Sequence, residues 1–363
     1  MNDPLRDDRP DALSALGWGF FFQVHFEALG LPDAEPARVV SESRGAFRVC
    51  GQHGETAGTV AGRLRFHAGE EQRYPAVGDW VAVRRLPDED RAVIQAVLPR
   101  RSRFSRKAPG PRTEEQMVAA NVDTVFVVSG LDGGRAFNVR RIERYLTLAW
   151  GSGAVPVVLL NKADLCPDVD GYVRRAEDAA PGVPVFPVSA TRRTGLDPVR
   201  GYLAGGSTAA FLGSSGVGKS ALINALLGEE KLPTGEIRGR DHTGRHTTTR
   251  RQLLLLPGGG IVIDTPGMRE LQLWAGEDDL DGAFRDIEEL AQGCRFSDCR
   301  HAAETGCAVK AAIEGGALDP ARLASYRKLQ KEIRYTALKE EDGFRRFEKE
   351  RWKNRMKGKP DWP

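Results

Sequence analysis

The segment with the most specific chemistry is GSSGVGKS, at 213–220. It fits the pattern G-x-x-x-x-G-K-[ST], whose glycines let backbone N–H groups turn toward the phosphates of a nucleoside triphosphate at the N-terminus of a helix. Lys219 adds charge at the β- and γ-phosphates, and the Ser220 hydroxyl can bind Mg²⁺. We expect these residues to hold the phosphates: Gly213, Ser214, Ser215, Gly216, Val217, Gly218, Lys219, Ser220 and Ala221.

Two shorter motifs predict which base the nucleotide carries. NKAD at 161–164 follows the apolar run VPVVLL and resembles the N-K-x-D guanine motif of GTPases. Asp164 can accept from guanine N1–H and the N2 amine, Asn161 can reach the other base edge, and the Lys162 stem can cover the ring. Adenine would leave the carboxylate unpaired, at about 1.5–3 kcal/mol for each lost hydrogen bond. SA at 189–190 resembles the accessory S-A-x element, whose backbone N–H meets guanine O6. The predicted base contacts are Asn161, Lys162, Ala163, Asp164, Ser189 and Ala190.

A third motif, DTPG at 264–267, follows the run GIVI. We expect Asp264 to orient Mg²⁺ through water and the Gly267 N–H to sense the γ-phosphate. The preceding stretch GRDHTGRHTTTRR is rich in Gly, Thr and charge, which predicts a switch loop. One of its threonines should bind Mg²⁺ when triphosphate is bound. Comparison of RHTTTRR with the switch pattern of related GTPases favours Thr248, with Thr247 as the alternative.

The residue that positions the attacking water is not evident from these motifs. Many GTPases carry a glutamine directly after D-x-x-G, whereas this chain has Met268. A thioether cannot orient water as an amide does, so intrinsic hydrolysis should be slow and another residue or a partner must complete the site. His246 is our candidate; the alternative is a switch-loop histidine that faces solvent or a partner. The predicted catalytic set is His246, Lys219 and Thr248.

A cluster of cysteines predicts a metal site. The spacing Cys294-x4-Cys299-x-His301-x5-Cys307 supplies three thiolates and one imidazole, the ligands of a closed tetrahedral zinc site with no position left for catalysis. The alternative is a set of reduced, buried cysteines with an exposed histidine. Magnesium would be held separately, by Ser220 and Thr248.

Length and composition limit the class of protein. At 363 residues, with 40% hydrophobic residues, the chain should form two or three globular domains. No stretch approaches the roughly 18 apolar residues of a membrane span, and the N-terminus lacks a secretory signal, so we expect a cytoplasmic protein. The net charge is only +3, but the charges are segregated: residues 91–112 hold seven bases and no acid.

The elements that must position these motifs change along the chain. Residues 38–106 alternate short β-rich runs with turns, which predicts a small five-stranded barrel. It leads into PRRSRFSRKAPGPR, where Phe104 among six bases is typical of a groove that binds single-stranded nucleic acid; the alternative is a solvated linker. From Asn121 apolar strands alternate with amphipathic helices, which predicts a doubly wound parallel sheet, and each nucleotide motif follows a strand.

The C-terminal part, from Asp279 to Pro363, is predicted to be helical. From about Pro320 one long basic helix should pack through an apolar stripe at helical spacing, made by Leu323, Tyr326, Leu329, Ile333 and Leu338. The last segment, FRRFEKERWKNRMKGKP, lacks a clean stripe, and it is either an ordered RNA-contacting helix or a frayed tail.

The order of the motifs is the most specific feature of the chain. Ras-like GTPases carry the phosphate loop first and the guanine motif late, whereas here the order is NKAD, SA, GSSGVGKS, TTT, DTPG. This order resembles the circularly permuted GTPases. With GRHTTT, DTPG followed by RE, and C-x-F-x-D-C-x-H, residues 38–340 resemble the ribosome small-subunit-dependent GTPase A family of bacterial ribosome assembly. The resemblance implies GTP hydrolysis stimulated by the 30S subunit in late maturation, an OB-fold barrel and one zinc ion.

We therefore predict a GTP- and Mg²⁺-dependent hydrolase that binds the 30S subunit and 16S rRNA, acts as a monomer and binds neither DNA nor membranes. Two alternatives remain: an RNA-binding module that uses GTP only as a structural ligand, and a GTPase of large-subunit assembly. The predicted division is an N-terminal extension, a barrel with a basic linker, a permuted GTPase domain and a helical zinc domain with a basic tail, at 1–36, 37–112, 113–276 and 277–363.

Overall fold

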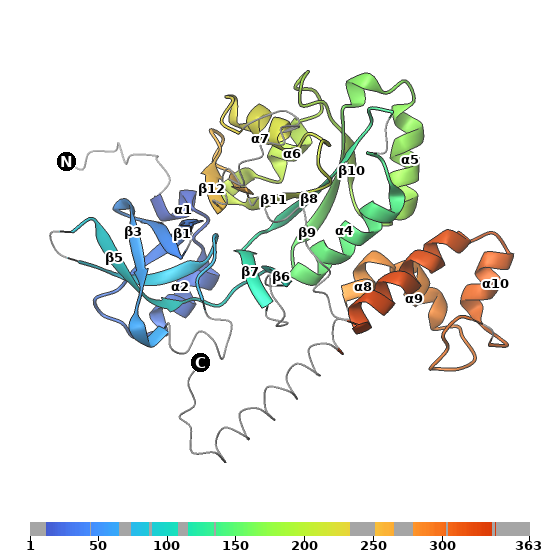
Figure 1. Cartoon of the computed structure of the whole chain (residues 1–363), viewed down its shortest axis with the longest axis horizontal. Helices are drawn as coiled ribbons and strands as arrows, with labels where there is room; N and C mark the ends of the chain where they lie inside the picture. Colours follow the sequence, from blue (N-terminus) through green and yellow to red (C-terminus); the bar gives the residue numbers. More distant parts are fainter. Residues whose placement is uncertain are drawn as a thin grey trace, which may run out of the picture.

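The computed structural model describes residues 12–43, 45–64, 74–86, 89–107, 115–133, 136–232, 251–264, 279–302, 304–335 and 338. They form an N-terminal barrel, a central α/β unit and a C-terminal helical unit, and the barrel and the helical unit flank the central one (Figure 1). Among the described helices there is none whose length and hydropathy would let it cross a bilayer.

The N-terminal unit is a closed barrel of five strands, as predicted. Pairing of the first strand with the fourth closes it, and the third and fifth strands pair in parallel. Side chains that alternate along the strands, such as Val39, Val49 and Ile94, are fully buried inside. The strands are β1 (Glu35–Ser43), β2 (Ala46–Gly51), β3 (Gly54–Val60), β4 (Trp80–Arg85) and β5 (Arg91–Val97).

The segment before the barrel contributes two short helices, α1 (Ala12–Ala15) and α2 (Phe20–Glu27). They cover Trp80 of β4, which is completely buried, and the Trp18 ring meets it edge-on with centroids 4.6 Å apart. The described part of this segment is thus packed on the barrel through aromatic rings, which favour such edge-to-face contacts.

A hairpin of β6 (Arg103–Lys107) and β7 (Glu115–Ala120) connects the barrel to the central unit. Phe104 on β6 is only 2% exposed and belongs to the core of the central unit, whereas the neighbouring Arg103 is exposed. Strand alternation points these two side chains in opposite directions. The stacking role predicted for Phe104 is therefore wrong, because its ring is not accessible to a base.

The central unit is the predicted doubly wound sheet. Five strands run parallel in the order β10-β9-β8-β11-β13, and β12 adds to the edge in antiparallel fashion. The strands are β8 (Thr124–Gly130), β9 (Val155–Asn161), β10 (Val185–Pro187), β11 (Thr208–Leu212), β12 (Arg251–Leu255) and β13 (Ile261–Asp264). Side chains from both faces of the sheet are buried, which explains the continuous apolar runs.

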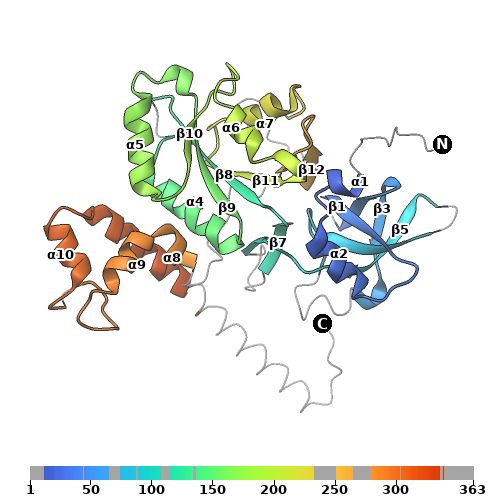
Figure 2. The ribbon, with the colours of Figure 1, turned by 180° about the vertical axis from the view of Figure 1, so that it is seen from behind.

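Helices cover both faces of this sheet (Figure 2). Along β8, Val125 and Val127 pack toward α4, whereas Phe126 and Val128 pack toward α7. The helices are α4 (Val139–Ser152), α5 (Val169–Ala179), α6 (Asp197–Gly201) and α7 (Lys219–Leu227). Short 3-10 turns, Ala163–Leu165 and Ala204–Gly206, complete the connections.

The barrel and the central sheet are joined edge to edge. Strand β12 pairs with β1 through Ser41 opposite Gln252, so the barrel and the parallel strands form one eleven-stranded sheet. Beside this joint, buried Arg38 donates to the carbonyls of Leu16, Gly78 and Asn121, and burial lowers its pKa to about 10. One side chain thus links the N-terminal helices, the barrel and the start of the central unit.

The C-terminal unit is helical, as predicted. It comprises α8 (Asp279–Ala283), α9 (Arg285–Ala291), α10 (Ala308–Glu314) and a helix over residues 320–335. Four members of the predicted apolar stripe are at most 8% exposed, and they join the core that lies beneath α4: Leu323, Tyr326, Leu329 and Ile333. Leu338 is 56% exposed, so its assignment to the stripe is wrong.

Candidate nucleotide site and metal centre

The phosphate loop lies between β11 and α7, at the carboxyl edge of the parallel sheet, where open α/β sheets bind ligands. Gly218 has a φ of +94°, and a Cβ there would lie 2.3 Å from the Asn161 side chain, so this position requires glycine. The Lys219 Nζ donates to the carbonyls of Gly213 and Ser214, each at 2.7 Å. The loop is thus already curled around the ammonium group that the phosphates would meet.

Asn161 holds three of the predicted motifs together. It ends β9, is 2% exposed, and its Nδ2 donates to the Val217 carbonyl in the phosphate loop at 2.9 Å. Its Oδ1 accepts from the Ala190 N–H, in the S-A dipeptide, at 3.1 Å. The three segments come from separate strands, and one side chain fixes their spacing. Contact between Asn161 and the base edge stays a prediction.

The other residues of the guanine motif lie next to Asn161. The Lys162 Nζ bonds the Asp132 carboxylate at 2.5 Å, and the Ala163 N–H donates to the Val188 carbonyl. The Asp164 side chain is 12% exposed, with Arg192 Nε 3.7 Å from its Oδ2. A carboxylate in this position can exchange the arginine for donors on a guanine.

The remaining predicted nucleotide residues divide into two groups. Ser189 accepts from the Arg192 N–H through its Oγ, and Asp264 ends β13 beside β11. The rest of the phosphate loop, from Ser215 to Ala221, spans the turn and the start of α7. The predicted residues His246, Thr247, Thr248, Gly267 and Met268 lie outside the described residues.

Sequence reasoning missed three residues at this site. Asp132 and Arg192 pair with members of the guanine motif, and Arg141 on α4 donates to the Ser214 Oγ at 2.9 Å. None belongs to a motif. The available signals were their positions just after β8 and after the S-A dipeptide, where parallel strands bring loops to one edge.

The four predicted metal ligands converge in the helical unit. The ligand atoms of Cys294, Cys299, His301 and Cys307 all lie within 4.8 Å of one another. The His301 Nδ1 is 3.6 Å from the Cys294 Sγ and 3.5 Å from the Cys307 Sγ, and these two sulfurs are 3.9 Å apart. A zinc tetrahedron has edges of about 3.6 Å between sulfur and nitrogen and about 3.8 Å between sulfurs. The donor set and its spacing therefore fit zinc.

The surroundings of the cluster shift its ligands in different directions: burial raises the pKa of Cys299 to about 11, whereas the pKa values of Cys294 and His301 are lowered. Burial acts to raise the pKa of Cys294, but hydrogen bonds from the Val309 and Ala308 N–H groups, together with those from Cys299 and Cys307, outweigh it and lower that pKa. Burial lowers the pKa of His301, which favours the neutral imidazole. Arg327, on the helix over 320–335, donates to the His301 carbonyl and so ties the ligand loop to that helix.

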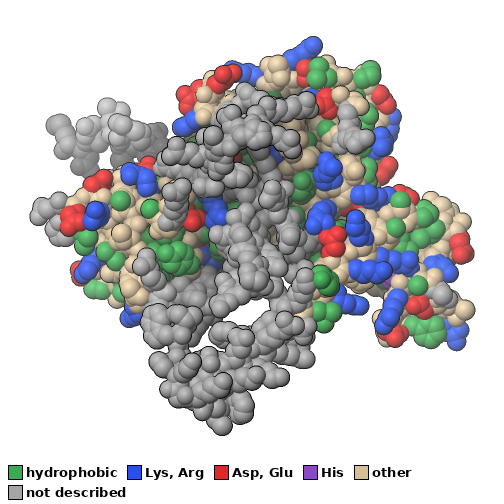
Figure 3. Space-filling view, viewed as in Figure 1, with side chains coloured by type: hydrophobic (Ala, Val, Ile, Leu, Met, Phe, Trp, Pro, Cys, Tyr) green, Lys and Arg blue, Asp and Glu red, His purple; other side chains and the backbone are tan. Residues whose placement is uncertain are grey.

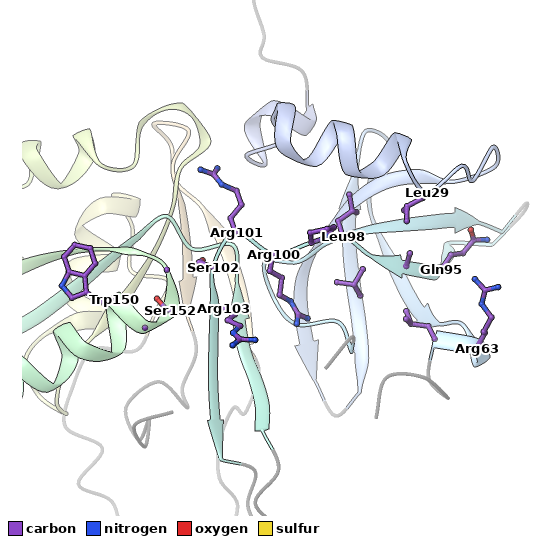
Figure 4. Close-up of a pocket in the computed structure, with 16 residues that line it drawn as sticks. Leu29, Arg63, Gln95, Leu98, Arg100, Arg101, Ser102, Arg103, Trp150 and Ser152 are labelled. Carbon is purple, nitrogen blue, oxygen red and sulfur yellow. The ribbon is translucent and has the colours of Figure 1, made fainter. Parts of the chain in front are cut away.

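A basic groove lies between the barrel and the central unit (Figure 4). Its volume is about 1110 Å³, and the described residues that line it include no carboxylate, although Arg100 pairs with the buried Asp79 at 2.7 Å. Figure 4 shows Arg100, Arg101 and Arg103 between Trp150 of α4 and Arg63 of the barrel. Trp150 is 37% exposed, so an aromatic ring accompanies the arginines here even though Phe104 is buried.

Residues 97–274 match the sequence family described as RsgA GTPase. The chain is 47% identical over 355 residues to the small ribosomal subunit biogenesis GTPase RsgA of Opitutus terrae, covering 95% of this chain and 96% of the relative. It resembles the crystal structure of YjeQ from Thermotoga maritima, with a TM-score of 0.63 and 29% identity over 83% of this chain and 98% of that one. YloQ, described as a circularly permuted GTPase, has a TM-score of 0.61 at 22% identity, over 83% and 95%. The predicted permuted fold is confirmed.

Proposed function

This chain belongs to the RsgA GTPase family, and we propose that its GTP hydrolysis is switched on by the 30S ribosomal subunit during late maturation of that subunit. The chain is a small ribosomal subunit biogenesis GTPase, an enzyme that hydrolyses GTP. The observation that most supports the proposed nucleotide site is the Asn161 side chain, which joins the guanine motif, the S-A dipeptide and the phosphate loop.

The proposed recognition of guanine rests on Asp164. Its carboxylate would accept from guanine N1–H and N2–H, the Ala190 loop would bring an N–H toward O6, and the stem of Lys162 would lie along the ring. Support comes from the Asn161 side chain, which joins this motif to the Ala190 loop and the phosphate loop, and from Arg192, which shows that the largely buried Asp164 carboxylate can face a charged donor. Adenine offers no donor at either position.

The proposed chemistry is attack of water on the γ-phosphate. The Lys219 ammonium would leave the carbonyls of Gly213 and Ser214 for the β- and γ-phosphates and balance the developing charge. Mg²⁺, which neutralises phosphate charge when bound, would be held by Ser220 and Thr248, with Asp264 acting through water. His246 stays our candidate for orienting the attacking water.

The proposed role of the metal centre is structural. Zinc bound by three thiolates and one imidazole has no open position, so it would hold the loop between α9 and α10 in place rather than take part in hydrolysis. Because Arg327 links that loop to the helix over 320–335, the ion would also stabilise the packing of that helix.

We propose that 16S rRNA contacts two basic surfaces. One is the groove of Figure 4, where the exposed side chains of Arg63, Arg101 and Trp150 suit a phosphate backbone with an unpaired base, whereas Arg100 is paired with Asp79. The other lies where α4 and α5 meet the helical unit, and Figure 3 shows Lys and Arg side chains gathered there. Because ribosomes assemble in the cytoplasm, a protein that acts on the 30S subunit would be located there. We propose that it acts as a monomer.

The test is single-turnover GTP hydrolysis measured with and without isolated 30S subunits, with 50S subunits as the control. The proposal expects stimulation by 30S subunits only. Stimulation by 50S subunits alone would indicate a large-subunit factor. Tight binding to 30S subunits without stimulated hydrolysis would indicate an RNA-binding module that uses GTP as a structural ligand.

A further inference from the structure

Helix α4 touches the phosphate loop through a side chain that belongs to no motif. The Arg141 Nη1 donates to the Ser214 Oγ at 2.9 Å, and the Ser214 carbonyl accepts from the Lys219 Nζ at 2.7 Å. Arg141 therefore acts on the same residue that positions the Lys219 ammonium before nucleotide arrives. Its contact is with the loop, so we assign it the role of a positioning residue.

The loop that leads into α4 contacts the nucleotide site at a second point. Asp132 pairs with Lys162 of the guanine motif, and the Ser129 Oγ donates to the Ala136 carbonyl, which steadies the turn before the helix. The Asn138 side chain then caps α4 by accepting from the Arg141 N–H. The N-terminal end of α4 is thus fixed to both halves of the nucleotide site.

Another face of α4 is locked to the helical unit by buried charges. Glu143 is completely buried and pairs with Arg140 at 2.5 Å and with Arg322 at 3.1 Å. Arg322 is 4% exposed and makes two further hydrogen bonds of 2.6 Å to the Asp286 carboxylate. Arg140 also reaches Asp319 at 2.7 Å. Breaking one partner of such a buried network leaves an unpaired charge, so the network holds one geometry.

We propose that α4 couples movement of the helical unit to the phosphate loop. Arg141 is the positioning residue through which α4 acts on that loop. This proposal rests on the proposed stimulation by the 30S subunit. The ion network and Arg141 lie within two turns of one helix, so a shift of the helix over 320–335 moves Arg141 with it. Arg141 in turn sets Ser214, and Ser214 sets where Lys219 stands relative to the transferring phosphate.

The test compares Arg141→Met with wild type, with and without 30S subunits, in single-turnover hydrolysis with the protein in excess over GTP and in a multiple-turnover GTP titration that gives KM. The control is Arg200→Met, which removes an exposed arginine whose ion pair in the described part of the chain is with Asp197. We expect Arg141→Met to lower the stimulated rate constant roughly tenfold, the equivalent of one charge-assisted hydrogen bond, and to change the KM for GTP less than threefold. Arg141→Lys, which keeps a charged donor, should recover at least half of the rate.

A double mutant tests whether the route passes through the ion network. Arg140→Met removes contacts to Glu143 and Asp319 at a half-exposed site, so it avoids the unfolding that loss of Arg322 risks. If the coupling passes through α4, Arg141→Met should lower the stimulated rate constant by a smaller factor in the Arg140→Met background than in wild type. Two outcomes would overturn the inference. One is that Arg141→Met lowers the stimulated rate constant by the same factor in both backgrounds, and the other is that the rate constant of Arg141→Met lies within twofold of that of Arg200→Met. A wild-type protein that 30S subunits do not stimulate would instead overturn the proposed function.

Discussion

The Asn161 side chain offers the sharpest test of how the nucleotide site is assembled. In Asn161→Ala the Val217 carbonyl and the Ala190 N–H lose their partners at a site that is 2% exposed. Two neutral hydrogen bonds contribute about 1 kcal/mol each, and the groups left unpaired in the interior add to the loss, so the free energy of unfolding should fall by about 2–4 kcal/mol.

The same change should weaken nucleotide binding. Without Asn161 the phosphate loop and the Ala190 loop are no longer held at their spacing, and binding must restore that order. A loss of about 2 kcal/mol corresponds to roughly a thirtyfold higher Kd for GDP. Titration of a fluorescent GDP analogue would measure this Kd, and urea unfolding would measure stability.

Asn121→Ala is the matched control. Asn121 is 5% exposed, and its side chain also makes one accepted and one donated hydrogen bond, to the Arg101 N–H at 2.9 Å and the Gly78 carbonyl at 3.1 Å. Its φ of +54° makes alanine slightly costlier there, by about 1–2 kcal/mol. Because it lies at the barrel joint, its loss should destabilise the protein with less than a threefold effect on the Kd. Equal effects of both variants on the Kd would refute the argument that Asn161 holds the phosphate loop and the Ala190 loop at the spacing that nucleotide binding needs.

Three further predictions concern the base, the metal and the buried charges. Asp164→Asn replaces two acceptors by an amide that can donate, so it should weaken GTP binding by roughly a hundredfold or more and favour a xanthine nucleotide; competition titrations would show it. Removal of zinc with a chelator, or Cys294→Ser, should lower the Tm of the helical unit, and calorimetry with metal analysis should show the two losses together. An unchanged Tm in metal-free protein would exclude a structural ion. Burial raises the pKa of Glu143 from its ordinary 4.5, so the native state binds the proton more tightly than the unfolded state. Proton binding therefore stabilises the native state. This contribution to stability is complete below the pKa of the unfolded state and is lost as pH rises through the pKa of the folded state. The stability of Glu143→Gln relative to wild type, from urea titrations, should therefore increase as pH rises above 4.5, and the opposite slope would contradict this.

Local spacing was enough to predict that the Cys3His ligands converge and that the chain is a GTPase. The phosphate loop, the guanine motif and the Cys294–Cys307 cluster each depend on residues that are close in sequence, so the pattern of types carries their geometry. The same holds for the parallel sheet, because its continuous apolar runs can only be buried on both faces.

Contacts between distant segments could not be predicted. The pairing of Ser41 with Gln252 and the approach of Arg141 to Ser214 join residues that no local pattern relates. Phe104 shows a second limit: the surrounding bases indicated an RNA-binding segment, but charge pattern does not say which face of a strand turns inward. Arg103 faces outward and Phe104 faces inward because the hairpin packs against the core of the central unit, and the local sequence does not specify that packing.

The edge-to-edge joint between β12 and β1 also covers part of the outer edge of β12, at Arg251 and Gln252. An enzyme fragment without the barrel would present the outer backbone of β12 as an open edge, whereas the freed barrel would stay closed through the pairing of β1 with β4. Unpaired edges of this kind recruit strands from other molecules. The barrel is therefore a cap for the catalytic sheet as well as a candidate RNA-binding surface, and a soluble fragment would need charged residues placed on β12 to replace it.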